Sequence, residues 1–258
     1  PLASSSAASD VYKRQSLLIE QKAFIKALFR DLKNPPTTHI IYKKLLREMN
    51  FTIKGEIRWR ELGLPMPQWK NSWQNLAPPI HQEKLWKTKH FILHQRDRID
   101  TQHIPNKPPR KPCSFCQQKQ IRPTPPDTHL HALALCPQAK DTWDELQPLI
   151  TKIDYACLPS RRQEWILGIK GTNKKTLVLN TLISSAIHIL WTAKNEQDKE
   201  NKTTPPKIIA KKITQAFKAA ITYWFLIHKR NKSLESFKNQ ILIQQICTID
   251  QESLQFYI

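Results

Sequence analysis

Glycine and acidic residues are scarce in this 258-residue chain, which has 4 glycines against 19 prolines. Strand-like alternation of apolar and polar residues is also rare. Few glycines and many apolar residues at helical spacing favour helices joined by proline-marked connections. Because 40% of the residues are hydrophobic, such helices can bury a sizeable core. The sequence therefore predicts a mostly α fold, built as an irregular helical array.

The shortage of acidic residues leaves the chain strongly cationic. Lys and Arg total 41 and Asp and Glu total 21, so the formal net charge is +20. A surplus of this size says little about fold, but it favours polyanionic partners. The alternative is a solvated basic surface that has no partner.

Long apolar runs are also missing. The Ala/Ser-rich residues 1–15 contain no block long enough for a signal sequence. They resemble translated adaptor sequence, and we expect them to be a non-native leader. The longest apolar stretch, residues 176–200, is interrupted by Asn180, Ser184, Ser185 and His188. We expect a core helix there, no membrane partner, and an intracellular location in the nucleus or cytoplasm.

Cysteine and histidine concentrate in residues 113–136. Cys113 and Cys116 are separated by two residues, a spacing at which two thiolates bind one tetrahedral metal ion. His131 and Cys136 are separated by four residues and can complete the tetrahedron, although His129 can replace His131. A proline-rich loop lies between the pairs, and a metal would supply the free energy that folds it back. The motif predicts one structural Zn²⁺ that staples this small loop.

Three other interpretations compete with zinc. A Cys-x-x-Cys pair can be a redox dithiol, but that motif usually accompanies a strand–helix–strand pattern, which is missing here. A disulfide is possible in a secreted chain, and nothing marks this chain as secreted. Unligated buried thiols are the third alternative, and we expect Cys157 and Cys247 to be of that kind.

The cysteine- and histidine-rich stretch at residues 113–136 belongs to a longer series of motifs. Leu85-Trp86-Lys87 and the run from His90 to Leu93 precede it, and an acidic-Thr-x-x-His element runs from Asp127 to His131. Cys136-Pro137 ends it, Trp143 follows six residues later, and residues 189–195 read Ile-Leu-Trp-Thr-Ala-Lys-Asn. This order resembles the zinc-binding domain C-terminal to the polymerase in reverse transcriptases of non-LTR (LINE-type) retrotransposons. Lys194 replaces the usual Arg of the last motif. The resemblance selects His131 over His129 as the fourth ligand.

The resemblance also implies a function. Such a domain binds element RNA or target DNA beside an upstream polymerase domain of the same native protein. We expect no polymerisation by this chain, because reverse transcriptases use paired aspartates for two-metal chemistry and the chain contains no Asp-Asp dipeptide. The alternatives are a helical scaffold or protein-interaction module with a structural zinc, and a metal-dependent nuclease, for which no carboxylate cluster is evident.

The expected domain organisation places a helical segment at residues 16–79, the zinc-binding domain at 80–150 and a C-terminal helical segment at 160–258. Helices are expected at 16–33, 38–49, 82–98 and 176–200 and after Pro137 and Pro206, and a last amphipathic segment is expected at 233–249. Eight cations on the helix and linker before Cys113 are the predicted phosphate contacts: Lys84, Lys87, Lys89, Arg96, Arg98, Lys107, Arg110 and Lys111.

Overall fold

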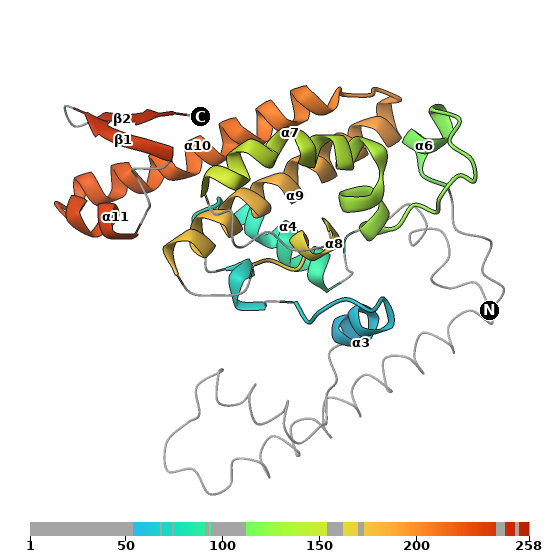
Figure 1. The fold of residues 1–258 in the computed structure, drawn as a ribbon, viewed down its shortest axis with the longest axis horizontal. Helices are drawn as coiled ribbons and strands as arrows, with labels where there is room; N and C mark the ends of the chain where they lie inside the picture. Colours follow the sequence, from blue (N-terminus) through green and yellow to red (C-terminus); the bar gives the residue numbers. More distant parts are fainter. Residues whose placement is uncertain are drawn as a thin grey trace, which may run out of the picture. The chain divides into compact units, whose positions relative to one another are not determined.

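The computed structural model describes residues 54–67, 69–73, 75–90, 93, 112–153, 162–169, 173–240, 246–250 and 253–257 (Figure 1). The chain divides into two units between Thr52 and Ile53, and the structure below is that of the second unit. Several expectations lie outside the described residues. They are the leader, the helices at 16–33 and 38–49, Cys157, and the cations Arg96, Arg98, Lys107, Arg110 and Lys111.

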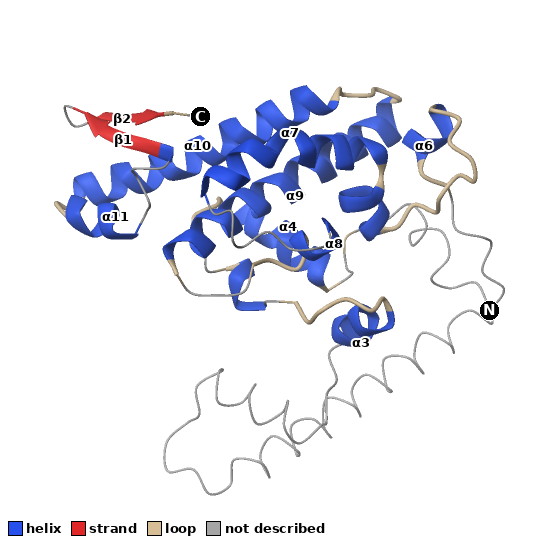
Figure 2. Cartoon of the chain, in the orientation of Figure 1, coloured by secondary structure: helices blue, strands red, loops and turns tan. Residues whose placement is uncertain are grey.

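The described elements are helical apart from one terminal hairpin, which confirms the mostly α prediction (Figure 2). In chain order they are α3 (Lys54–Glu61), η1 (Trp69–Ser72), α4 (Pro79–Lys89), α6 (Ser114–Gln118), η2 (His131–Leu135), α7 (Pro137–Ile153), α8 (Arg162–Trp165), α9 (Lys174–Glu200), α10 (Pro206–Arg230), α11 (Leu234–Gln240), β1 (Cys247–Asp250) and β2 (Ser253–Phe256).

Helix α9 lies at the centre of this unit and packs against α4, α7 and α10. Its start is fixed by Asn173, whose side chain accepts a hydrogen bond from the Thr176 amide at 2.7 Å. Its end is fixed by Asn201, which adopts a left-handed conformation with φ of 53°. Buried residues lie all around the helix, as expected of a helix with neighbours on several sides.

The apolar content of α9 is higher than we expected from its polar interruptions. By length and composition the helix is apolar enough to cross a membrane, with a mean hydropathy of 1.4 over its best window. However, 78% of that window is buried inside the fold. The core position of α9 among other helices accounts for this composition without a bilayer.

Proline begins two of the long helices, as the sequence predicted. Pro137 is the first residue of α7 and Pro206 the first of α10. Proline suits this position because the first helical amide has no partner within the helix. Helix α10 then buries a stripe at four-residue spacing, comprising Ile209, Ile213, Phe217, Ile221 and Phe225.

The predicted bounds of one helix are wrong, and the predicted C-terminal helical segment includes two strands. Helix α4 runs from Pro79 to Lys89 and is capped at His90, whereas we expected residues 82–98. Helix α11 ends at Gln240, and residues 247–250 form β1, which pairs antiparallel with β2, with Cys247 opposite Phe256. Alternate residues of this hairpin join the core beside α10, so tertiary packing decided its conformation.

One hydrophobic core extends from Trp59 to Cys247. It includes residues of α4, α6, α7, α9 and α10. The expected segments 80–150 and 160–258 therefore share a core, and the cysteine loop is built against the long C-terminal helices. Cys247 is buried within this core, as predicted.

Candidate metal centre

Four soft donors converge at one point. The ligand atoms of Cys113, Cys116, His131 and Cys136 all lie within 4.8 Å of one another, and all four residues are buried. Cys113 Sγ is 4.0 Å from Cys136 Sγ, and Cys116 Sγ is 3.3 Å from His131 Nε2. Donors placed at zinc-ligand distances around a tetrahedron are about 3.5–3.8 Å apart. The cluster therefore has the size and the donor set of a closed zinc site.

The first two donors are fixed by a tight knuckle. Cys113 precedes α6 and Cys116 lies within it. The Cys113 amide donates to the Pro125 carbonyl at 2.9 Å, and an isolated bridge joins Pro112 to Pro126. The Ile121 amide donates to the Cys116 carbonyl at 2.9 Å. These backbone bonds fold the proline-rich loop back onto the cysteine pair.

The second two donors are fixed by a single turn, η2, which has the wide spacing of a π-helix. The Cys136 amide donates to the His131 carbonyl at 2.6 Å, so the turn brings the two ligands to one side. The Trp143 indole donates to the Leu133 carbonyl at 2.9 Å and anchors the turn to α7. π-turns frequently occur at functional sites because they re-aim side chains.

His129 is excluded from the cluster. It is 2% exposed, and its Nε2 lies 3.0 Å from the Leu93 carbonyl oxygen. Its ring is 5.9 Å from that of Trp191. The geometry therefore places His131, and not His129, among the four donors.

The electrostatics of the four donors fit a divalent cation. Hydrogen bonds from Cys136 and His131 lower the pKa of Cys113 to about 4, whereas burial and the neighbouring Cys113 thiolate raise the pKa of Cys116 to about 12. The hydrogen bond with Cys113, together with burial, also raises the pKa of Cys136. Three thiolates cannot share this volume without a compensating charge. A bound Zn²⁺ supplies that charge.

A buried ionic network connects the loop to α9, and the sequence did not reveal it. Lys194 lies 2.8 Å from Asp127 and 2.5 Å from Asp198. Ser114, the first residue of α6, donates a short hydrogen bond to Asp198. Both Asp127 and Lys194 belong to motifs that the sequence singled out, but nothing in the sequence paired them. The network fixes the metal loop against the central helix.

Both partners of the Asp127–Lys194 pair have raised pKa values. Burial raises the pKa of Asp127 to about 6, against the opposing pull of Lys194. Burial alone would lower the pKa of Lys194, but the two carboxylates outweigh it and raise that pKa. Lys194 lies between two carboxylates. Both carboxylates stabilise its charge, whereas its single charge is shared between them. Removing the Lys194 charge would therefore leave both carboxylates uncompensated, whereas Lys194 would keep Asp198 if the Asp127 charge were removed.

The predicted phosphate contacts on α4 divide into two kinds. Lys84 and Lys87 are partly exposed, and Lys87 pairs with Glu83 at 2.5 Å. The prediction that Lys89 contacts phosphate is wrong, because its side chain is buried. Lys89 is 0% exposed and donates from Nζ to Ser72 Oγ at 2.9 Å. Burial lowers the pKa of Lys89 to about 7. Its chain points toward η1 instead of solvent, since α4 ends at this residue.

Two other groups of polar residues lie close together, one around His81 and one between α9 and α10. His81 Nδ1 lies 3.3 Å from Ser185 Oγ, and the His81 ring stacks on His188 with centroids 4.2 Å apart. Ser185 is 0% exposed, so no substrate reaches its hydroxyl. Burial, with His188, lowers the pKa of His81 to about 4 and keeps it neutral. This arrangement resembles a buried structural contact more than a nucleophile and base.

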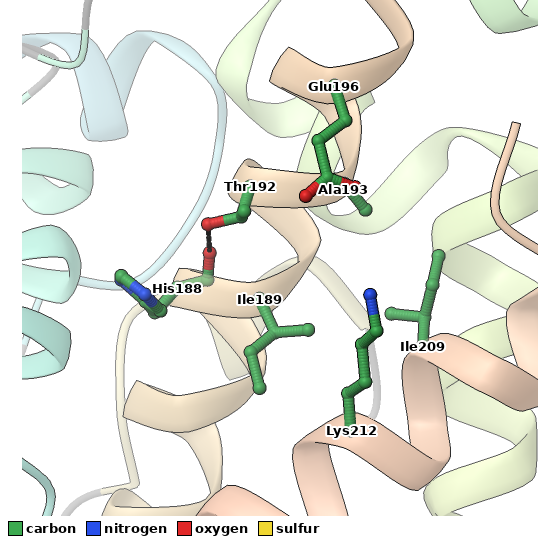
Figure 3. A pocket seen from close by; sticks show the side chains of 7 residues that line it. All are labelled: His188, Ile189, Thr192, Ala193, Glu196, Ile209 and Lys212. Carbon is green, nitrogen blue, oxygen red and sulfur yellow. Dashed lines mark hydrogen bonds between the residues drawn. The ribbon is translucent and has the colours of Figure 1, made fainter. Parts of the chain in front are cut away.

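A small pocket of about 140 Å³ lies between α9 and α10 (Figure 3). Its walls are formed by Ile189, Ala193 and Ile209, and its polar groups include Glu196 and Lys212. The Thr192 hydroxyl that lines it donates to the His188 carbonyl at 2.9 Å. One carboxylate and one amine on apolar walls do not form a metal-assisted nuclease site, which needs several carboxylates.

Comparison with known proteins adds no assignment: no protein family, no curated protein and no solved structure matches this chain.

Proposed function

We propose that this chain is the zinc-binding, non-catalytic, nucleic-acid-binding C-terminal segment of a non-LTR retrotransposon reverse transcriptase. In this proposal it contacts element RNA or target DNA beside an upstream polymerase domain of the same protein. The observation that carries the proposal is the buried convergence of Cys113, Cys116, His131 and Cys136. The motif order around these residues and the net charge of +20 support it.

The role of the metal in this proposal is structural. Four protein donors fill a tetrahedron and leave no position for water or substrate. Zinc bound there would add folding free energy to a loop whose described backbone has few regular hydrogen bonds. The chain's own residues would hold the loop against α9 through Ser114, Asp127 and Lys194.

Elemental analysis of the purified protein tests the metal. We expect one zinc per chain, retained in His129→Ala and largely lost in His131→Ala. Cys247→Ala is the matched cysteine control, because Cys247 is buried outside the cluster. Less than half an equivalent of zinc in the native chain would overturn the metal assignment.

Salt-dependent binding to labelled RNA and DNA tests the nucleic-acid role. We expect log K to fall linearly with log salt, with a slope that corresponds to about four or more phosphates. No primer extension is expected with Mg²⁺ and nucleotides. A folded, zinc-loaded protein that fails to bind at low salt would favour the scaffold alternative, and robust extension would overturn the non-catalytic proposal.

A further inference from the structure

Helix α10 has an unusual charge distribution. Residues 201–234 contain eight Lys or Arg residues and no Asp or Glu. The helix buries its apolar stripe against α7 and α9 and also contacts α11 and β2, and exposed residues remain on the side of the helix away from these elements. Exposed positions recur along it at helical spacing: Lys207, Lys211, Lys212, Tyr223, Leu226 and Arg230. None of these residues is among the phosphate contacts predicted from the sequence.

The three lysines at the start of α10 lie where their positive charge destabilises the isolated protein. They occupy the first two turns, where the helix dipole is positive and acidic residues are normally favoured. No acidic residue lies in the first turn. Lys207 and Lys211 are also like charges four residues apart, which repel each other. Within the described part of the chain, no ion pair involves these three lysines. A bound polyanion would relieve this repulsion.

The outward face also carries an aromatic ring between its cationic ends. Tyr223 is 63% exposed and Leu226 is 54% exposed. Lys212 and Arg230 are eighteen positions apart, or about 27 Å along the helix axis. A nucleic-acid strand carries several phosphates over that length. An exposed aromatic ring between phosphate-binding groups is the arrangement that stacks on an unpaired base.

We propose that the outer face of α10 binds single-stranded nucleic acid, with phosphates on Lys207, Lys211 and Lys212 and a base stacked on Tyr223. This inference rests on the proposed function and assigns it a surface. A membrane surface is disfavoured because the apolar stripe of α10 is already buried in the core. The outward face retains only scattered apolar residues.

One acidic group lies beside this face. Glu196 of α9 and Lys212 line the same pocket, and Figure 3 shows both side chains directed toward the space between the two helices. The carboxylate weakens the positive field at Lys212. Replacing Glu196 with Gln should therefore strengthen phosphate binding, a change that misfolding cannot produce.

The test uses the full zinc-loaded chain and a fluorescent single-stranded 20-mer over a range of salt concentrations. We expect Lys207→Ala/Lys211→Ala/Lys212→Ala to reduce the slope of log K against log salt by about 2, since each lost single-strand contact is worth about 0.7. The matched control, Lys119→Ala/Lys140→Ala/Lys174→Ala, removes the same charge from exposed lysines on other elements. It should retain most of the slope.

Three further variants sharpen the result. Tyr223→Ala should weaken binding to single strands about 5- to 100-fold with little effect on a duplex, and Tyr223→Phe should restore it. Glu196→Gln should tighten binding several-fold. Equal losses in the two triple variants, or a Glu196→Gln variant that binds no tighter, would overturn the assignment to α10 while leaving the proposed function intact.

The outcomes separate the two proposals. A native chain that binds no nucleic acid while folded and zinc-loaded would contradict the proposed function itself. Anionic vesicles of phosphatidylserine and phosphatidylcholine provide the other arm. Vesicle binding that the α10 triple variant abolishes, with strand binding unchanged, would reassign this face to a membrane surface and overturn our inference.

Discussion

The cysteine loop at 112–136 and the helix pair α9–α10 are stabilised by different forces. The helix pair buries large aliphatic and aromatic side chains over a long contact, including Ile183, Ile187, Ile213 and Phe217. The loop buries few such residues, and its first part is closed by an isolated bridge between Pro112 and Pro126. Apolar burial can hold the helices without a cofactor, whereas the loop requires a bond at its centre. Lys194 and Asp198 of α9 contact Asp127 and Ser114 of the loop, and these contacts join the two regions.

Metal removal should give the largest difference in stability between the cysteine loop and the helix pair. Structural zinc sites contribute about 10–16 kcal/mol of apparent binding free energy, most of which would be lost by the loop alone. We expect chelation to reduce the hydrogen-exchange protection of residues 113–136 by two orders of magnitude or more, while the central amides of α9 keep theirs. Exchange mass spectrometry with and without chelator measures both. Uniform loss across the chain would show that the loop and helices unfold as one unit.

The Lys194 network should give the next largest effect. Lys194→Met leaves the Asp127 carboxylate, which is 1% exposed, without its cation. Such an orphaned buried charge destabilises by about 3–5 kcal/mol. Chemical denaturation measures the change in the free energy of unfolding.

The double variant Asp127→Asn/Lys194→Met serves as the control for that change. It removes both charges of the Asp127–Lys194 pair, and Asp198 keeps its hydrogen bond from Ser114, so it should recover a large part of the lost free energy. If the double variant were less stable than Lys194→Met by a further similar amount, the two residues would act independently. The connection between the loop and α9 would then not depend on their pairing.

Lys89 is a second buried lysine in the helical part, and its pKa is shifted in the direction opposite to that of Lys194. Its pKa is lowered by burial from 10.5 to about 7, so the folded protein binds fewer protons there than the unfolded chain between these values. The free energy of unfolding should therefore rise with pH from about 7 toward 10, by up to about 1.4 kcal/mol per pH unit. Below pH 7 both states are protonated at this site and its contribution to the slope vanishes.

Lys89→Met isolates that contribution. Comparing the two proteins by denaturation at pH 7, 8 and 9 removes the titration of other groups. The variant should be more stable than the native protein at pH 7, and the difference should shrink by about 2 kcal/mol between pH 7 and 9. A constant difference across this range would mean that Lys89 does not titrate there.

Local patterns predicted some of these features and long-range contacts decided the others. Proline at Pro137 and Pro206 marked helix starts, and the Cys-x-x-Cys spacing identified half of the metal site. The burial of Lys89 could not be predicted, because it depends on Ser72 and η1 folding over the end of α4. The same applies to the terminal hairpin, whose apolar residues suit either conformation until α10 is in place.

The smallest expected effect concerns the hydrogen bond by which Trp143 of α7 supports the metal loop. Trp143→Phe keeps the aromatic bulk but removes the indole hydrogen bond to the Leu133 carbonyl. The lost bond should cost about 1 kcal/mol of stability, since a buried carbonyl is left unpaired. Because Leu133 lies in the turn between His131 and Cys136, zinc affinity should also fall, by about tenfold, as when the supports of metal ligands are removed.

Competition with a chromophoric chelator measures that affinity, and thermal unfolding measures the stability. Phe237→Leu is the matched control, because Phe237 is a buried aromatic residue in α11, outside the metal loop. It should lower stability by a comparable or larger amount and leave zinc affinity unchanged. Equal loss of zinc affinity in both variants would show that the metal site responds to global stability, so that the loop has no separate support from α7.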